Sequence, residues 1–112
     1  MSLNDGVYKA TFQTPIGIGF GVVTLLNGRL TGGDSSMYYI GTYRTDGATI
    51  HAEIHVRPHS AVFGLESVLG TSNANVTLTG TIVGDGARFD GSSANAPGIN
   101  MRAMLTPLDA TA

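Results

Sequence analysis

The sequence contains no cysteine and no tryptophan. Without cysteine, a disulfide, a thiol nucleophile and a cysteine-ligated metal site are all excluded. Charge is also scarce, because 6 Lys and Arg stand against 8 Asp and Glu, for a formal net charge of -2. The basic residues are scattered singly along the chain and form no stripe, so direct binding to nucleic acid is not expected.

Long hydrophobic segments are missing as well. The longest apolar runs are about four residues, whereas roughly 20 are needed to cross a bilayer, so no membrane span is predicted. The first residues lack the charged and apolar regions of a secretion signal, and a cytoplasmic location is expected. At 112 residues the chain has the length of one domain, which we assign to residues 5–107. Residues 1–4 and 108–112 are expected to be tails. The first of these segments could originate from cloning.

Glycine, by contrast, is abundant, with 16 residues that interrupt runs of Val, Ile, Thr, Tyr and Phe at short spacing. Asn27-Gly28, Asp46-Gly47 and Asp85-Gly86 each separate two such runs. These pairs are typical of two-residue hairpin turns, because both central residues of a type I′ turn need a positive φ. The sequence therefore predicts a series of β-hairpins.

Alternation of apolar and polar residues places the strands between these turns. We predict an all-β fold of eight strands, at residues 6–13, 16–26, 29–33, 37–45, 48–57, 75–83, 86–93 and 98–106. One apolar face per strand must be buried, and closure into an antiparallel up-and-down barrel buries it without leaving the exposed edges of a two-sheet sandwich. The longer segment from Pro58 to Asn75 is expected to be a loop with a short helical turn, either capping the core or lying across the barrel mouth.

Alternation also assigns side chains to the two surfaces of the barrel. An interior of eight strands is wide enough for side chains or for one small ligand. The residues predicted to point inward and to line a ligand site are Tyr8, Phe12, Phe20, Met37, Tyr39, Tyr43, Ile54, Leu78, Phe89 and Met101. Val23, Leu25 and Ile40 fall on the predicted outer face, and exposed apolar neighbours of this kind predict the interface of a homodimer.

The corner between the third and fourth predicted strands contains the largest number of turn-forming residues in succession. Gly32 and Gly33 are expected to supply positive φ for a bulge, and Asp34 is expected to accept hydrogen bonds from amides one or two residues further on. Ser35 extends this structural turn. Two tyrosines follow on the inward face, so their hydroxyls need partners, as in an apolar pocket with a few convergent polar groups.

No constellation for metal binding or catalysis is found. His51, His55 and His59 have a four-residue spacing, but on an extended strand this spacing separates the first two by roughly 13 Å, too far to share an ion. The alternating Gly17, Gly19 and Gly21 lie in a strand and not before a helix, so they predict a barrel bend or the close approach of another chain. No nucleophile has a credible base. We expect no enzyme activity, no catalytic residue, no metal and no cofactor.

One segment resembles a known family. The block from Asn27 to Ser35, followed by Tyr39, Gly41 and Tyr43, with Asp5–Tyr8 before it and Val62–Gly64 after it, is similar to the GrlR-like family, negative regulators of bacterial type III secretion. The resemblance implies a lipocalin-like eight-stranded barrel with an apolar cavity, which forms dimers. It also implies sequestration of a transcriptional activator through an acidic loop, but the matching hairpin, Thr45–Ala48, keeps a single acid, so this activity is not carried over.

The expected function is therefore a regulatory binding protein. It would act, for example as a negative transcriptional regulator, by binding a protein partner, a small apolar ligand, or both. Two alternatives stay open: an interaction module with a filled core, and a lipocalin-like carrier of small molecules. An isomerase or cyclase would need an acid or a histidine on the inner face, and none is predicted.

Overall fold

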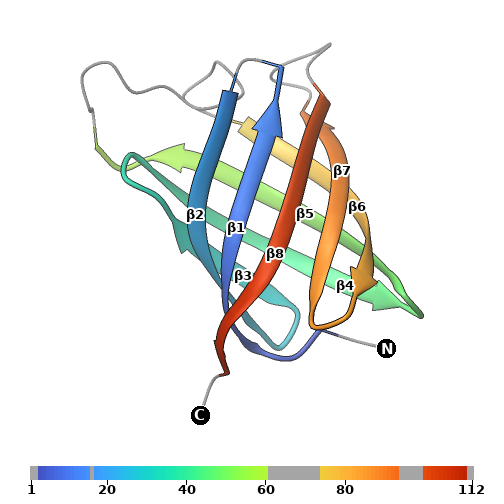
Figure 1. Ribbon diagram of the computed structural model, residues 1–112. Helices are drawn as coiled ribbons and strands as arrows, with labels where there is room; N and C mark the ends of the chain where they lie inside the picture. The colour runs from blue at the N-terminus through green and yellow to red at the C-terminus, as the bar shows by residue number, and fades with distance from the viewer. Residues whose placement is uncertain (1–2, 16, 61–73, 94–99, 111–112) are drawn as a thin grey trace.

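A computed structural model describes residues 3–15, 17–60, 74–93 and 100–110 of the protein. Its strands form a closed barrel in which each strand pairs antiparallel with its neighbours in sequence, and β8 returns to pair with β1 (Figure 1). The strands are β1 (Gly6–Thr14), β2 (Gly17–Leu26), β3 (Arg29–Gly33), β4 (Met37–Asp46), β5 (Thr49–Pro58), β6 (Ala74–Val83), β7 (Gly86–Ser93) and β8 (Asn100–Ala110). The predicted eight-stranded antiparallel barrel is confirmed.

The strand bounds follow the prediction closely, with the largest difference at the C-terminal end. β8 begins at Asn100 and extends to Ala110, so it includes part of the segment expected to be a tail. Leu3 is buried in the core at 7% exposure, so a domain boundary drawn at residue 5 leaves out a core side chain. The predicted helical turn within residues 61–73 lies outside the described residues.

Two of the three predicted turns move by one residue. Asn27 and Gly28 have φ of 52° and 80°, as the type I′ turn requires. In the other two hairpins a glycine with positive φ takes the first central position of the turn. One is Gly47, the second residue of the expected pair Asp46-Gly47, with φ of 62°. The other is Gly84, which precedes the expected pair Asp85-Gly86 and has φ of 60°. The turns therefore consist of Gly47-Ala48 and Gly84-Asp85, with positive φ only at the first residue, as in a type II′ turn.

The two ends of the barrel differ. Both termini lie at the end that carries the β2–β3, β4–β5 and β6–β7 hairpins, which we call the termini end (Figure 1). The opposite end carries the β1–β2 connection and the β3–β4 corner, and we call it the corner end. In the described ranges there is no helix long and apolar enough to cross a membrane.

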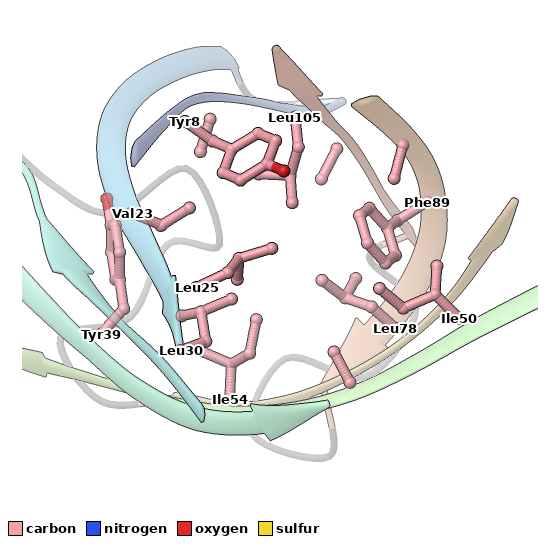
Figure 2. Packing of buried hydrophobic residues seen from close by; sticks show 14 of the residues in the cluster. Tyr8, Val23, Leu25, Leu30, Tyr39, Ile50, Ile54, Leu78, Phe89 and Leu105 are labelled. Carbon is pink, nitrogen blue, oxygen red and sulfur yellow. The ribbon is translucent and has the colours of Figure 1, made fainter. Parts of the chain in front are cut away.

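Alternation predicted the inner face of most strands correctly. All eight strands contribute side chains to the apolar core in the interior, with Leu25 of β2 and Ile50 of β5 as its most buried large side chains (Figure 2). Ile50, Ala52 and Ile54 point inward from β5, as expected. The polar residues between them face solvent or lie at the surface of the sheet.

β2 is inverted with respect to the prediction. Phe20 is 63% exposed and faces outward, whereas Val23 and Leu25 are 2% and 1% exposed in the core, so they cannot form the predicted interface. The rule that the more hydrophobic face is buried fails here because the inward positions nearest the β1–β2 connection are glycines. Gly21 has no room for a side chain: an added Cβ would lie 2.8 Å from the Tyr39 hydroxyl oxygen. Thus space, and not hydrophobicity, fixes the orientation of this strand.

Candidate ligand-binding cavity

The barrel contains a cavity of about 230 Å³. Residues from all eight strands and from the β3–β4 corner line it, and most of them are aliphatic or aromatic. Its apolar wall includes Phe12, Ile54 and Leu78, and its few polar residues, Asp34, Ser35, Ser36 and Tyr39, all come from the β3–β4 corner and the strand that follows. The cavity is therefore an apolar chamber with one polar end.

Most of the residues predicted to bind a ligand do line this cavity. Those that line it are Phe12, Phe20, Met37, Tyr39, Ile54, Leu78, Phe89 and Met101. Phe20 does so from the rim, because its side chain is largely exposed. Tyr8 and Tyr43 point inward as predicted but lie near the termini end, away from the cavity.

The cavity reaches the surface beside β2. β3 pairs with β2 from Val22 to Leu26, so among the described strands residues 17–21 pair with β1 alone. Ile18 and Phe20 line the cavity from this half of β2, and Ser35 and Ser36 line it from the corner. The inward residues of this half strand are glycines, so this half strand points no side chain into the cavity, although Tyr39 takes the space next to Gly21. The short β2–β3 ladder and the glycines together produce the opening.

Asp34 organises the polar end of the cavity. Its Oδ1 accepts hydrogen bonds from the backbone N–H of Ser36, at 2.9 Å, and of Met37, at 2.8 Å. The donors are two and three residues further on, one residue later than predicted. Its own N–H donates to the Met37 carbonyl oxygen at 2.9 Å. This network closes the corner without any ligand, as a structural turn does.

The two glycines of the corner act differently from the prediction. Neither Gly32 nor Gly33 has a positive φ. They are required instead because neighbouring strands approach closely: a Cβ on Gly32 would lie 2.1 Å from the Val22 carbonyl oxygen, and one on Gly33 would lie 2.8 Å from the Met37 carbonyl oxygen. Side chains at these positions would separate β3 from its neighbours, so the glycines hold the corner next to the cavity.

Tyr39 connects the corner to the apolar wall. Its hydroxyl donates a short hydrogen bond to Asp34 Oδ2, and its ring meets Phe12 edge to face, with centroids 5.4 Å apart at 74°. Figure 2 shows the ring at the margin of the core beside β2. Burial raises the pKa of the Tyr39 phenol well above its usual value, and the hydrogen bond to Asp34 and its negative charge add to the shift. Tyr39 therefore remains a neutral donor.

Two further tyrosines, Tyr8 and Tyr43, contact the N-terminal segment at the termini end. The Tyr8 hydroxyl donates to the Asn4 carbonyl oxygen at 2.5 Å, and the Tyr43 hydroxyl lies 3.5 Å from Asp5 Oδ1. Burial raises the pKa of Tyr8, and also that of Tyr43, to which the Asp5 carboxylate contributes. These contacts attach the N-terminal segment to the barrel at this end.

The histidines make separate contacts. His51 Nδ1 lies 3.5 Å from the Thr79 hydroxyl, His55 Nδ1 lies 2.6 Å from the Asn75 side-chain oxygen, and His59 Nε2 lies 2.9 Å from the Asp34 carbonyl oxygen. Over the part of the chain that the structure describes, no group of histidine, aspartate or glutamate residues is arranged to hold a metal ion.

A row of apolar side chains faces outward on β2 and β4, and two of them, Ile18 and Phe20, also border the cavity at its opening. Ile18, Phe20 and Val22 of β2 and Tyr38 and Ile40 of β4 are all exposed large hydrophobic residues, and we call them the outer apolar face. Gly33 of β3 pairs with Val22 on one side and with Tyr38 on the other, so no side chain separates these two. Ile40 has the outward position that the sequence predicted, with 46% exposure.

Sequence reasoning missed two features of the site. Asp34 and Ser35 were predicted as parts of a structural turn only, yet both line the cavity, and Ser36 lines it as well. The small inward residues Ala10, Ala52 and Ala103 also line it. Their signal was in the sequence, since small residues at inward positions leave space, but reading it requires knowing which side chains oppose them across the barrel.

No family model matches the chain, and no curated protein matches it at a significant level.

Proposed function

We propose that the protein is a non-enzymatic regulatory binding protein that takes up a small apolar ligand inside its barrel. The observation that carries this proposal is the cavity of about 230 Å³ with an apolar wall and a single polar end. Pockets of this kind bind by burying the apolar part of a ligand, while a few polar groups fix its orientation. A cytoplasmic location and the GrlR-like resemblance belong to the same proposal.

The regulatory part of the proposal draws on the resemblance of the Asn27–Ser35 block. Regulation would act through a protein partner, with repression of transcription as the form that the resemblance implies. The hairpin that corresponds to the family's acidic loop contains Asp46 as its only acid. A partner would therefore bind another surface, and the ligand in the barrel would control that contact.

The proposal is non-enzymatic because Asp34, which provides the only carboxylate among the described residues that line the cavity, is already engaged in structure. Asp34 accepts hydrogen bonds from Ser36, Met37 and Tyr39. General acid–base catalysis needs a group that exchanges a proton with the bound molecule, and neutralising this carboxylate would weaken the corner. Among the described residues, no histidine lines the cavity.

Binding can be tested with n-octanol, whose size suits the cavity. A cavity of about 150 Å³ takes up benzene, so this one has room for roughly nine carbon-sized atoms. We expect octanol to shift the amide NMR signals of residues around the cavity, with a single dissociation constant. Ala52→Leu, which places a side chain into the cavity, should abolish these shifts, whereas Ala48→Leu, in an exposed turn, should leave them unchanged.

Native mass spectrometry of the protein purified from its own host complements this titration. A bound molecule that is retained by the wild type and lost from Ala52→Leu would support the proposal. If octanol causes no saturable shifts and no small molecule copurifies, the cavity does not serve a ligand, and the alternative of an interaction module gains ground.

A second candidate function is self-association through the outer apolar face. Five large apolar side chains lie exposed on β2 and β4, which is more than scattered surface residues account for. A two-fold symmetric dimer would use this patch twice. We propose that a second copy of the chain covers it and that the interface contains Phe20, Val22 and Ile40, in place of the predicted Val23 and Leu25.

Sedimentation velocity tests this candidate. Ile40→Asp introduces a charge into the centre of the patch and should weaken the dimer at least tenfold. Thr77→Asp introduces the same charge at an exposed position on β6 and should leave the dimer unchanged. A wild-type protein that sediments as a monomer at 100 μM would rule out this interface.

A further inference from the structure

We infer that the cavity selects an amphipathic ligand with a cationic, ammonium-type head, which Asp34 binds at the polar end. This inference rests on the proposed function, because it specifies the chemistry of a ligand for the same cavity. It follows from the charge, the hydrogen-bonding capacity and the position of one carboxylate.

The first step concerns charge. Asp34 lines the cavity and is half-buried, next to a wall that is otherwise apolar. Within the described ranges the single ion pair joins Arg102 and Asp90 on the outer surface, and none involves Asp34. The His59 ring contacts the carbonyl oxygen of Asp34 and not its carboxylate. The negative charge at this end of the cavity therefore has no cationic partner in the described chain.

The second step concerns hydrogen bonds. An ionised carboxylate has about four acceptor sites on its two oxygens. The N–H groups of Ser36 and Met37 use two of them on Oδ1, and the Tyr39 hydroxyl uses one on Oδ2. One acceptor site on Oδ2 remains, on the oxygen that Tyr39 holds. A ligand head that donates a hydrogen bond fits this site, and one that only accepts does not.

The third step combines the two. An alkylammonium group donates hydrogen bonds and carries the opposite charge, so its bond to a carboxylate is about twice as strong as a neutral one. A fatty acid would bring a second carboxylate to the same place and would be repelled. An alcohol can donate a hydrogen bond to the carboxylate, but it carries no charge of its own and lacks the attraction between opposite charges. The order of affinity expected for heads on one chain is amine, then alcohol, then carboxylate.

The volume of the cavity limits the size of the apolar tail of the ligand. Room for roughly nine non-hydrogen atoms corresponds to an alkyl chain of about eight carbons with a small head, or to a phenyl ring with a two-carbon arm. Ser35 and Ser36 border the polar end of the cavity, so the ligand head has polar neighbours besides Asp34. The tail would extend toward Phe12 and Leu78.

The test compares n-octylamine, n-octanol and n-octanoate at neutral pH on the wild-type protein, by amide NMR titration. We expect octylamine to bind at least tenfold more tightly than octanol, and octanoate to bind at least tenfold more weakly. The amides of Ser36 and Met37, which donate to Asp34, should shift with octylamine much more than with octanol. Added salt should weaken octylamine binding and leave octanol binding unchanged.

Two variants complete the test. Asp34→Asn keeps an acceptor for the two amides and removes the charge, so it should bring the affinity for octylamine down to that for octanol. Asp46→Asn removes the same charge from an exposed hairpin at the termini end and should change neither affinity. If Asp34→Asn does not fold, the wild-type series and its salt dependence still decide the outcome.

The two proposals fail in different ways. If octanol binds but octylamine binds no more tightly, or if octanoate binds best, the inference about the head group is wrong while the ligand-binding proposal stands. If none of the three binds, the ligand-binding proposal itself is wrong.

Discussion

At the scale of single residues, Tyr39 and Gly21 depend on each other. The Tyr39 ring and hydroxyl occupy the space that a side chain on Gly21 would need, and this places the hydroxyl within reach of Asp34. A single glycine on β2 thus allows a tyrosine from β4 to join the polar corner. The two residues are far apart in sequence, and the contact between them exists only because the barrel closes.

Gly21→Ala tests this dependence. The added Cβ would lie 2.8 Å from the Tyr39 hydroxyl oxygen and 3.0 Å from the Gly33 carbonyl oxygen. Overpacking of this kind costs about 1–3 kcal/mol of unfolding free energy. Gly17→Ala, on the same side of the same strand, has nothing within 4 Å of its Cβ and should be close to neutral. Urea denaturation of both variants measures the difference, and equal stabilities would contradict the packing described here.

The raised pKa of Tyr39 also predicts that the stability of the fold decreases at alkaline pH. The pKa of this tyrosine in the folded protein is raised, chiefly by burial, whereas an unfolded tyrosine titrates near pH 10. Below about pH 10 the phenol is protonated in both states, and its contribution to stability is fully present. Above it, the unfolded chain loses a proton that the folded protein keeps, so the unfolding free energy falls by about 1.4 kcal/mol per pH unit.

Removing the phenol should remove this contribution. Tyr39→Phe is expected to make the fall of the unfolding free energy above pH 10 less steep by about 1.4 kcal/mol per pH unit, which corresponds to one proton. Tyr8 and Tyr43, whose pKa values are also raised, still contribute to the remaining slope. At neutral pH the same variant should lose about 1.5–3 kcal/mol, the usual contribution of a hydrogen bond to a charged group. Chemical denaturation from pH 8 to 11.5 measures both effects. An unchanged slope would mean that the phenol ionises equally in both states.

At the scale of elements, β2 is the strand whose two halves differ most. Its second half pairs with β1 and β3, whereas its first half pairs with β1 alone among the strands that the structure describes. Leu26 and Arg29 flank a two-residue turn and form a hydrogen-bonded pair, so by alternation Thr24 and Val22 also bond to β3. The main-chain groups of Ile18 and Phe20 point the same way, but β3 has already ended at Gly33.

This difference predicts a boundary in hydrogen exchange. We expect the amides of Ile18 and Phe20 to exchange with solvent much faster than those of Val22 and Thr24, because exchange there needs no opening of the ladder. Amide exchange followed by NMR at low protein concentration provides the measurement. Slow exchange at Ile18 and Phe20 would indicate that another strand, for example from a second copy, covers this edge.

The element scale also shows why the sequence predicted some strands and not others. β5 and β6 have one face of large apolar residues and one of polar residues, so alternation assigned them correctly. β2 has Ile18, Phe20 and Val22 on one face and glycines on the other, so the same rule inverted it. Hydrophobicity measures which face gains from burial, whereas the space left by opposing strands decides which face fits.

At the scale of the whole molecule, the cavity is a place where the core is incomplete. Packing in protein interiors is dense, and side chains that border a void lose dispersion contacts. The small residues Ala10, Ala52 and Ala103 border this one from three different strands. Larger side chains at these positions would fill the space and add stability, so the cavity that we propose to bind a ligand is kept at a cost in stability.

Ala52→Leu makes this trade-off measurable. Three additional carbon atoms would enter the cavity, and at roughly 0.8 kcal/mol per buried methylene the unfolding free energy should rise by up to about 2 kcal/mol. The same substitution at Ala48, which is exposed, should change stability by less than about 0.5 kcal/mol. Thermal and urea unfolding give the two values. A large loss of stability in Ala52→Leu would show that the cavity collapses or is already filled.

The sequence alone determined the eight strands, their order and the barrel. Turn residues and alternation are local signals, and in this barrel each strand pairs with its neighbours in sequence, so local signals are sufficient to predict the topology. The sequence also identified Asp34 as the centre of a turn and most of the inward aromatic residues. Only the tertiary structure decided that Asp34 borders a cavity, that Val23 and Leu25 are core residues, and that Phe20 is exposed. These facts depend on the volume enclosed by strands that are distant in the chain, such as the space that Tyr39 takes from Gly21, and no local pattern encodes that volume.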